Sequence, residues 1–333
     1  MAMNTRKLVL LFTALLGLTA AAFAETQATE ATVAQITGSA VVTLPDGSSK
    51  ALTAGMKVPQ GATIVTSTGS EVYLQTHTGT VATIKANSTV AVDELSVTTS
   101  GGKVTEEKTT LNLKSGNLVS ALDPTKRSVN NYQVRTPKGV AAARGTTFTV
   151  QVNGETYTIV TTSGKVEITT PSGAVVSVAA GQASVSSHAG GAATAIADLP
   201  AQEKTDAINA MAVAVGTIAV AADKGMLGSS GAAEVQAAAT TVMTAAPEAA
   251  ATVAATVAAV APAQNASVTA AAQTVATNTG NTSLTTTVQQ TQSTTPPASS
   301  TPTPPSNPTS PTAPTPPATT PQPIDPSTVS RSG

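Results

Sequence analysis

Between about residue 31 and residue 187 the chain is a succession of short segments rich in threonine and valine, and this pattern limits the possible folds most. Turn-forming residues separate the segments, as at Pro45-Asp46-Gly47 and Thr68-Gly69-Ser70. β-Branched residues favour strands, whereas glycine, proline and aspartate favour turns. The pattern predicts an all-β sandwich, barrel or solenoid with an open pairing order. The expected strands are Val41–Leu44, Ala62–Thr66, Glu71–Thr76, Val81–Lys85, Thr89–Val92, Leu111–Leu113, Leu118–Val119, Tyr132–Arg135, Thr146–Val152, Tyr157–Thr161, Lys165–Thr169 and Val175–Val178.

One charged residue, Arg144, stands inside an otherwise apolar and β-prone run and directly precedes Gly145. In an unbroken strand, Arg144 would share a face with four residues that look like core: Val140, Ala142, Phe148 and Val150. A guanidinium on a core face is costly unless its donors are paired. Arg144 is therefore either a buried anchor or an exposed residue that a bulge at Gly145 turns outward. We expect the buried, structural role, with backbone carbonyls or a carboxylate as partners.

Residues 1–24 have the features of a secretory signal peptide. Arg6 and Lys7 precede the apolar run Leu8–Leu18, and the segment ends in Ala22-Phe23-Ala24. The apolar run is shorter than the roughly 20 residues that a membrane-spanning helix needs. We expect cleavage between Ala24 and Glu25, which places the mature chain in the periplasm, at the cell surface or in the medium. The chain has no cysteine, which excludes disulfides, thiolate chemistry and a lipid-modified N-terminal cysteine.

Near residue 199 the composition becomes alanine-rich and the apolar period becomes helical. Residues spaced by three or four positions form one stripe of a first helix, namely Ile208, Met211, Val215, Ile218 and Ala222. Asp223-Lys224-Gly225 would end this helix, and a second would run between Pro247 and Pro262. We expect an alanine-rich helical region over residues 199–276 that packs or self-associates rather than spanning a membrane.

Residues 278–333 are rich in threonine and serine and then in proline. Such a segment has little apolar surface to bury, so we expect it to be disordered. It would serve either as a stalk through a wall or matrix, or as an inert tail.

The charged and aromatic residues do not suggest a catalytic site. Lysine and arginine number 17 against 18 acidic residues, so no basic face for nucleic acid is expected. We expect His77 and His188 on the surface, and the pairs Asp93-Glu94 and Glu106-Glu107 to be solvated charges in polar connections. The sequence contains no calcium loop, P-loop or dinucleotide pattern, so we expect no enzyme, cofactor or metal site. The tyrosines Tyr73, Tyr132 and Tyr157, together with Phe148, are expected to pack in the core.

Several of these segments, taken in order, resemble the FecR domain, an extracytoplasmic β domain first recognised in a ferric-citrate signalling regulator. The resemblance covers about residues 31–186. Its most specific part is the motif formed by Val134, Thr136, Pro137, Arg144, Gly145, Thr146, Phe148 and Val150. Other parts are Gly38–Val41, Ile64–Thr66, Leu113–Leu118, Gly164–Ile168 and Gly181-Gln182. The resemblance implies a FecR-like β-sandwich or solenoid in which Thr136, Pro137, Arg144, Gly145, Thr146 and Phe148 have structural roles.

We therefore expect an exported, non-catalytic protein that acts as an interaction or structural module of the cell envelope. Its partner would be another envelope protein, and the alanine-rich helices would allow self-association. The alternative is a soluble periplasmic component of a FecR-type signal-transduction system. Regulators of that family resemble anti-sigma factors with a cytoplasmic segment and one transmembrane helix, whereas a cleaved signal peptide is expected here.

Overall fold

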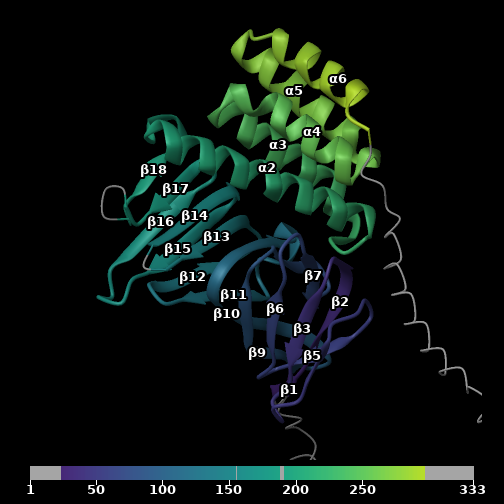
Figure 1. Cartoon of the computed structure of the whole chain (residues 1–333), viewed down its shortest axis with the longest axis vertical. Coiled ribbons are helices and arrows are strands. Elements are labelled where there is room, and N and C mark those ends of the chain that lie inside the picture. The colour runs from purple at the N-terminus through teal and green to yellow at the C-terminus, as the bar shows by residue number, and fades with distance from the viewer. Residues whose placement is uncertain (1–23, 155, 188–190, 297–333) are drawn as a thin grey trace, which may run out of the picture. The chain divides into compact units, whose positions relative to one another are not determined.

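The computed structural model describes residues 24–296 except Glu155 and residues 188–190 (Figure 1). This part of the chain contains eighteen strands followed by five α-helices. The expected fold class, mainly β followed by helices, is confirmed. The signal peptide expected at residues 1–24 lies outside the described residues except for Ala24, and Glu25 is the first residue of strand β1.

Two sheets, here called A and B, contain all the strands. Sheet A has the pairing order β4 (Ser49–Ala51), β3 (Ala40–Thr43), β6 (Thr63–Thr66), β9 (Thr89–Ser100), β10 (Lys103–Leu122), β11 (Asn130–Thr136), β12 (Gly139–Ala143), β15 (Lys165–Thr169) and β16 (Val175–Ala179), with β1 (Glu25–Ala28) also beside β9. Sheet B has the order β5 (Lys57–Pro59), β2 (Glu30–Thr37), β7 (Glu71–His77), β8 (Thr80–Ile84), β10, β13 (Thr147–Asn153), β14 (Thr156–Ser163), β17 (Gln182–Val185) and β18 (Ala193–Ala195). Pairing is antiparallel throughout except between β10 and β11.

Strand β10 belongs to both sheets, because its first half pairs with β9 and β11 and its second half with β8 and β13. The change occurs near Gly116, whose φ is +95° and where a Cβ would collide with Ser88. The two separate strands expected at Leu111–Leu113 and Leu118–Val119 are therefore wrong: both belong to β10, and Gly116 between them bends one strand instead of ending it.

The polar connections expected around Asp93-Glu94 and Glu106-Glu107 are also wrong, because these residues lie within the long hairpin of β9 and β10. The expected solvation is wrong for Glu107, which is 8 % exposed and paired with Lys126, whereas Asp93, Glu94 and Glu106 are half-buried.

The β core lies between the two sheets. Its side chains come from alternating positions, such as Ala82 and Ile84 in β8, which are fully buried. The ring of Phe148 meets that of Tyr132 edge to face, with the centroids 6.1 Å apart. All four aromatic residues that were expected in the core are at most 8 % exposed, which confirms that prediction.

The helices are α2 (Ala201–Asp223), α3 (Gly231–Ala245), α4 (Ala250–Val260), α5 (Asn265–Thr279) and α6 (Ser283–Thr294). Helices α2 and α3 contact β14 of sheet B (Figure 1), and α4, α5 and α6 pack on them in turn. Apolar side chains from the outer face of sheet B, such as Val81 and Val160, share one core with the helices. Helix α2 is long enough to cross a membrane, and its most apolar 18-residue window has a mean hydropathy of 1.5. However, 72 % of that 18-residue window is buried within the protein.

The two helices that the periodicity predicts correspond to α2 and α4. Helix α3, which lies between them in the chain, was not predicted. Helix α6 contradicts the disorder expected from residue 278 onward, because it buries Leu284 and Val288 against α4 and α5. Two apolar residues one turn apart are enough to hold a short helix on an existing core. The rest of the expected tail, from residue 297, lies outside the described residues.

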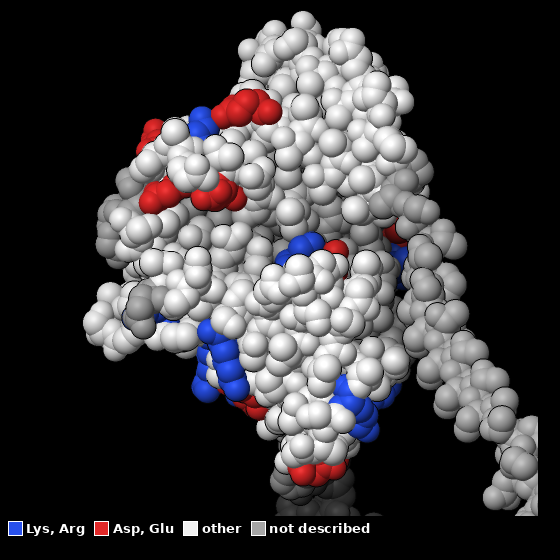
Figure 2. All heavy atoms as spheres, in the orientation of Figure 1, with Lys and Arg blue, Asp and Glu red and all other residues white. Residues whose placement is uncertain are grey.

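The helices leave the two sheets in different environments. Sheet B is covered on both faces, so polar residues such as Thr83 and Thr149 have no exposed surface. Figure 2 shows few charged side chains over the helices, and between residues 225 and 296 only Glu234 and Glu248 carry charge. The outer face of sheet A instead carries charged and amide side chains, so a polar site is best sought there.

Candidate functional site

The hairpin of β11 and β12 begins the site. Its turn contains Thr136 and Pro137. The hydroxyl of Thr136 donates a 3.0 Å hydrogen bond to the carbonyl of Gly139 and accepts one of 3.2 Å from the amide of Lys138. A threonine that bonds within its own turn fixes the turn's shape. These residues therefore set the register of β11 against β12.

Arg144 is exposed, so the expected buried anchor is wrong. Gly145 has a φ of +57° and turns the chain between β12 and β13. The residues of β12 that face the core are Ala141 and Ala143, whereas Val140 and Ala142 are on the outer face. Arg144 continues the outward-facing positions of β12 after Val140 and Ala142. The alternation breaks only at Gly145, so Phe148 and Val150 of β13 face the core instead of sharing the face of Arg144.

Two other motif residues, Thr146 and Phe148, are buried. Thr146 is 1 % exposed, and its Oγ1 lies 3.1 Å from the carbonyl oxygen of Lys165 and 3.2 Å from that of Arg144. The hydroxyl has one proton for these two carbonyls, and its oxygen also accepts a 3.4 Å hydrogen bond from the amide of Lys165, which joins the corner after β12 to β15. Phe148 is fully buried in the β core. The motif thus shapes the corner from which Arg144 projects.

A second arginine, Arg127, reaches the same corner from a different loop. Asp123 accepts hydrogen bonds from the amide and the hydroxyl of Thr125, at 2.8 and 2.7 Å, and so begins a 3₁₀ turn at Pro124–Lys126. Lys126 pairs with Glu107 at 2.9 Å and anchors that turn to β10. Arg127 follows directly, and its guanidinium donates a 3.4 Å bond to the carbonyl of Gly145.

Together these elements form a groove of 590 Å³ on the outer face of sheet A. Across β11, β12 and β15, Gln133 pairs with Ala142, which pairs with Glu167. The small Ala142 side chain lies between two longer ones, so this row of the sheet is hollow at its middle strand. The positively charged residues that line the groove are Arg127, Arg144 and Lys165.

Charge within the groove is unevenly distributed. Lys165 pairs with Glu167 at 2.8 Å, and this hydrogen bond and charge hold the pKa of Glu167 below its usual value. Both of these side chains are exposed, so the pair contributes little to stability. Arg127 donates only to a neutral carbonyl, and the described part of the chain gives the Arg144 side chain no hydrogen bond or ion pair. The arginine end of the groove is therefore the electropositive end.

A smaller hollow of 350 Å³ adjoins the groove, and Arg144 and Asn131 line both. Asn131 donates a 2.7 Å hydrogen bond to the carboxylate of Glu106. Glu106 is thus tied to an amide rather than to either arginine.

His77 is 8 % exposed, so the expectation of a surface histidine is wrong. It ends β7, and its Nε2 lies 3.2 Å from the carbonyl oxygen of Lys108. Burial lowers the pKa of His77 and so favours the neutral ring. His188 lies outside the described residues. The described residues contain no group of three or more histidine, cysteine, aspartate or glutamate side chains that could hold a metal ion.

The fold and the groove define a two-sheet β module with one polar face open and the other covered by helices. The FecR family model, described as "FecR protein", matches residues 62–167. The chain therefore contains a FecR domain, and the resemblance seen in the sequence is confirmed over that range. Arg127, Arg144 and Lys165 all lie within the matched segment.

Two solved structures are similar to parts of the chain, both of a "putative anti-sigma factor" from Parabacteroides distasonis. One is 16 % identical, with a TM-score of 0.32, and the match covers 40 % of this chain and 57 % of that one. The other is 14 % identical, with a TM-score of 0.27, and the match covers 52 % of this chain and 59 % of that one. The chain thus spans less than two thirds of either structure. No curated protein sequence matches the chain.

Sequence reasoning singled out Arg144 but missed Arg127, Gln133 and Lys165, which share its groove. Residues 127 and 165 lie on loops or strand ends, and no local pattern links them to residue 144. Only the pairing of β12 with both β11 and β15 brings them together.

Proposed function

We propose that the chain is an exported, non-catalytic FecR-domain protein that acts as a protein-interaction or structural module of the cell envelope. The observation that carries this proposal is the FecR match over residues 62–167, together with the open groove that lies on the matched segment. The groove combines charged and amide side chains with apolar surface over three strands, as suits contact with another protein surface.

The chemistry of the groove supports a binding role. Its one carboxylate, Glu167, is ion-paired and held ionised, whereas a general acid needs a raised pKa. Its remaining polar side chains are arginine, lysine and amides, which bind and orient rather than attack. The packing of α2 and α3 on sheet B, with α4–α6 packed on those helices, supports a second, structural role for the helical region.

The FecR match also favours a second candidate, a component of a FecR-type signal-transduction system. In that case the partner would be a membrane regulator or an outer-membrane receptor. Both candidates require export, so the mature chain should begin at Glu25. Mass spectrometry of the protein recovered from the cell envelope or the medium measures this directly, and an intact N-terminus on cytoplasmic protein would contradict export.

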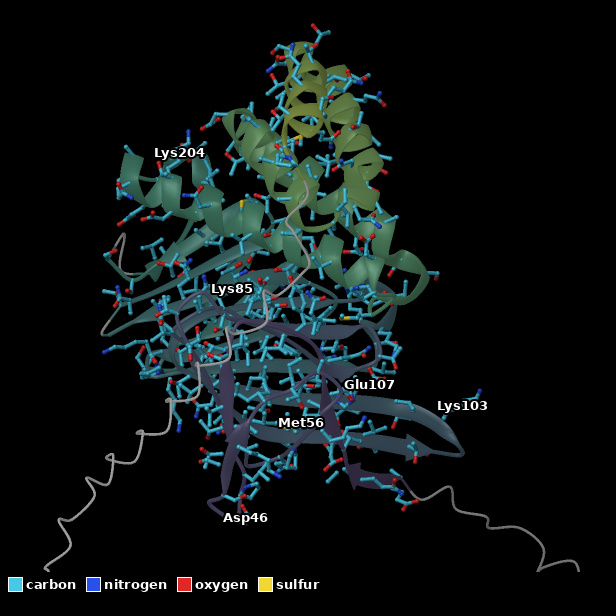
Figure 3. All side chains as sticks on the ribbon, turned by 45° about the vertical axis from the view of Figure 1, so that its right-hand side comes forward. Asp46, Met56, Lys85, Lys103, Glu107 and Lys204 are labelled. Carbon is cyan, nitrogen blue, oxygen red and sulfur yellow. The ribbon has the colours of Figure 1, made fainter. Side chains whose placement is uncertain are left out.

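Site-specific photocrosslinking in the native host tests the interaction surface. A photoreactive phenylalanine analogue replaces Gln133, which lines the groove. The matched control carries it at Lys103, which lies at the tip of the β9–β10 hairpin (Figure 3). We expect a defined protein adduct from Gln133 that Lys103 does not give. A membrane regulator in the adduct supports signalling, and a structural envelope protein or a second copy supports the module. Equal adducts at both positions, or none at Gln133, would overturn the proposed interaction surface.

A further inference from the structure

Two arginines in the groove form no ion pair among the described residues, although Glu234 of α3 lies close enough to Arg127 for a Coulombic interaction. Several other basic residues on sheet A are ion-paired, as in Lys165–Glu167, Lys108–Glu94 and Arg135–Asp93, whereas Lys50, Lys103 and Lys114 have no ion pair among the described residues but lie outside the groove. Arg127 bonds only a neutral carbonyl, and Arg144 has no side-chain partner among the described residues. Both project into the same groove from separate loops. Two guanidinium groups that converge in this way are suited to one anionic group, because each presents a planar set of donors.

The shape of the groove points to an extended ligand. Its floor is the small Ala142, with Gln133 on β11 to one side and Glu167 on β15 to the other. Neighbouring strands lie about 4.8 Å apart, so the hollow over β12 is about two strand spacings wide and runs along the strand. That width admits a single extended chain. The described residues contain no hydrogen-bond partner for the Gln133 side chain, so its amide can both donate to and accept from a peptide main chain.

We propose that this groove binds an extended acidic segment of a partner protein, with a carboxylate held between Arg127 and Arg144 and a main-chain amide held by Gln133. This inference rests on the proposed function in that it takes the partner to be a protein. At the other end of the groove Lys165 is already paired with Glu167, so the acidic residue of the partner lies at the arginine end. The peptide therefore binds in one direction, with a neutral or basic residue near Glu167.

Peptide binding to the purified full chain tests the proposal. The probe is a fluorescein-labelled hexapeptide with the sequence Thr-Val-Glu-Glu-Val-Thr, and its counterpart has glutamine in place of both glutamates. Fluorescence anisotropy measures both affinities. We expect the glutamate peptide to bind at least about tenfold more tightly than the glutamine peptide, and more weakly as the salt concentration rises.

Variants locate the binding site. Arg144→Ala and Arg127→Ala should each weaken binding of the glutamate peptide about fivefold, as expected for charge pairs at a partly exposed site. Lys103→Ala removes one positive charge from the distant hairpin tip and should leave the affinity unchanged. Because Arg127 and Arg144 are exposed, their replacement should not change the melting temperature, which checks that the fold is intact.

Three outcomes would overturn the proposal. The first two are equal affinity for the two peptides and a loss of peptide affinity in Lys103→Ala as large as in the arginine variants. The third is full displacement of the peptide by inorganic phosphate at a concentration equal to the dissociation constant of the peptide. The last would make the groove a simple anion site. Failure here is distinguishable from failure of the proposed function. If the adduct at position 133 persists in the Arg127→Ala/Arg144→Ala double variant, the groove is still an interaction surface, but the partner segment is not held through an acidic residue.

Discussion

Replacing Gly145 with alanine should destabilise the β domain by about 2–5 kcal/mol. An alanine at a φ of +57° adopts a left-handed backbone, which costs about 1–2 kcal/mol. Its Cβ would also lie 2.6 Å from the Cα of Pro124, a main-chain atom that can move only if the whole 3₁₀ turn moves. Forced overpacking of this kind costs about 1–3 kcal/mol.

Gly47 is the matched control, because it separates backbone strain from collision. Its φ is +82°, and a Cβ there would meet nothing within 4 Å. Gly47→Ala should therefore cost only the left-handed strain, about 1–2 kcal/mol. Both variants restrict the unfolded chain equally, so that contribution cancels in the comparison. The difference between the two variants isolates the contact with Pro124.

Thermal unfolding followed by circular dichroism measures the difference. At roughly 2–4 °C for each kcal/mol, Gly145→Ala should melt well below Gly47→Ala. The same variant should weaken binding of the acidic peptide, because Gly145 directly follows Arg144 in the chain and the Gly145 carbonyl holds Arg127. Melting temperatures that agree within about 1 °C would show that the corner accommodates a side chain, and our account of Gly145 would fail.

Two further predictions concern residues whose environment the sequence did not predict. Burial lowers the pKa of His77 below its usual 6.5, so the unfolded chain takes up the proton first as the pH falls. The contribution of His77 to the free energy of unfolding should be fully present above about pH 6.5 and decrease below it, with Glu107 opposing and Lys126 reinforcing the lowered pKa. In His77→Asn the urea midpoint should lose this part of its pH dependence. The same slope of urea midpoint against pH in both proteins would contradict the prediction. On α6, Val288→Ala should cost about 2 kcal/mol, whereas Thr286→Ala, at an exposed position, should cost little. Urea unfolding that does not distinguish these two variants would mean that α6 does not pack as described.

Local patterns predicted the fold class well, because threonine- and valine-rich segments with glycine turns leave few alternatives to a β fold. They failed at β10, where Gly116 bends a strand instead of ending it. A glycine with positive φ serves a turn or a bend equally well, and the choice depends on whether the partner strands continue. That information is non-local: it comes from β8 and β13, which pair with the second half of β10.

The histidine and the tail failed for a related reason. His77 is flanked by polar threonines, so its neighbours in sequence indicate an exposed loop. It is buried because β10 contributes the Lys108 carbonyl beside its ring. Likewise, Leu284 and Val288 are too few to fold a helix alone, and α6 depends on a core that α4 and α5 already provide. Burial supplied by distant segments leaves no trace in local composition.

Arg144 shows how a motif that builds a fold can also expose a binding group. The motif's threonine and phenylalanine hold the corner, as Thr146 bonds β15 and Phe148 enters the core. Arg144 keeps to the outer face of β12, and the break in alternation at Gly145 then turns Phe148 and Val150 of β13 to the core. An arginine at that exposed position needs no hydrogen-bond partner in the core. Its charge adds nothing to the packing that the motif provides, which is why we assign it to a ligand rather than to the fold.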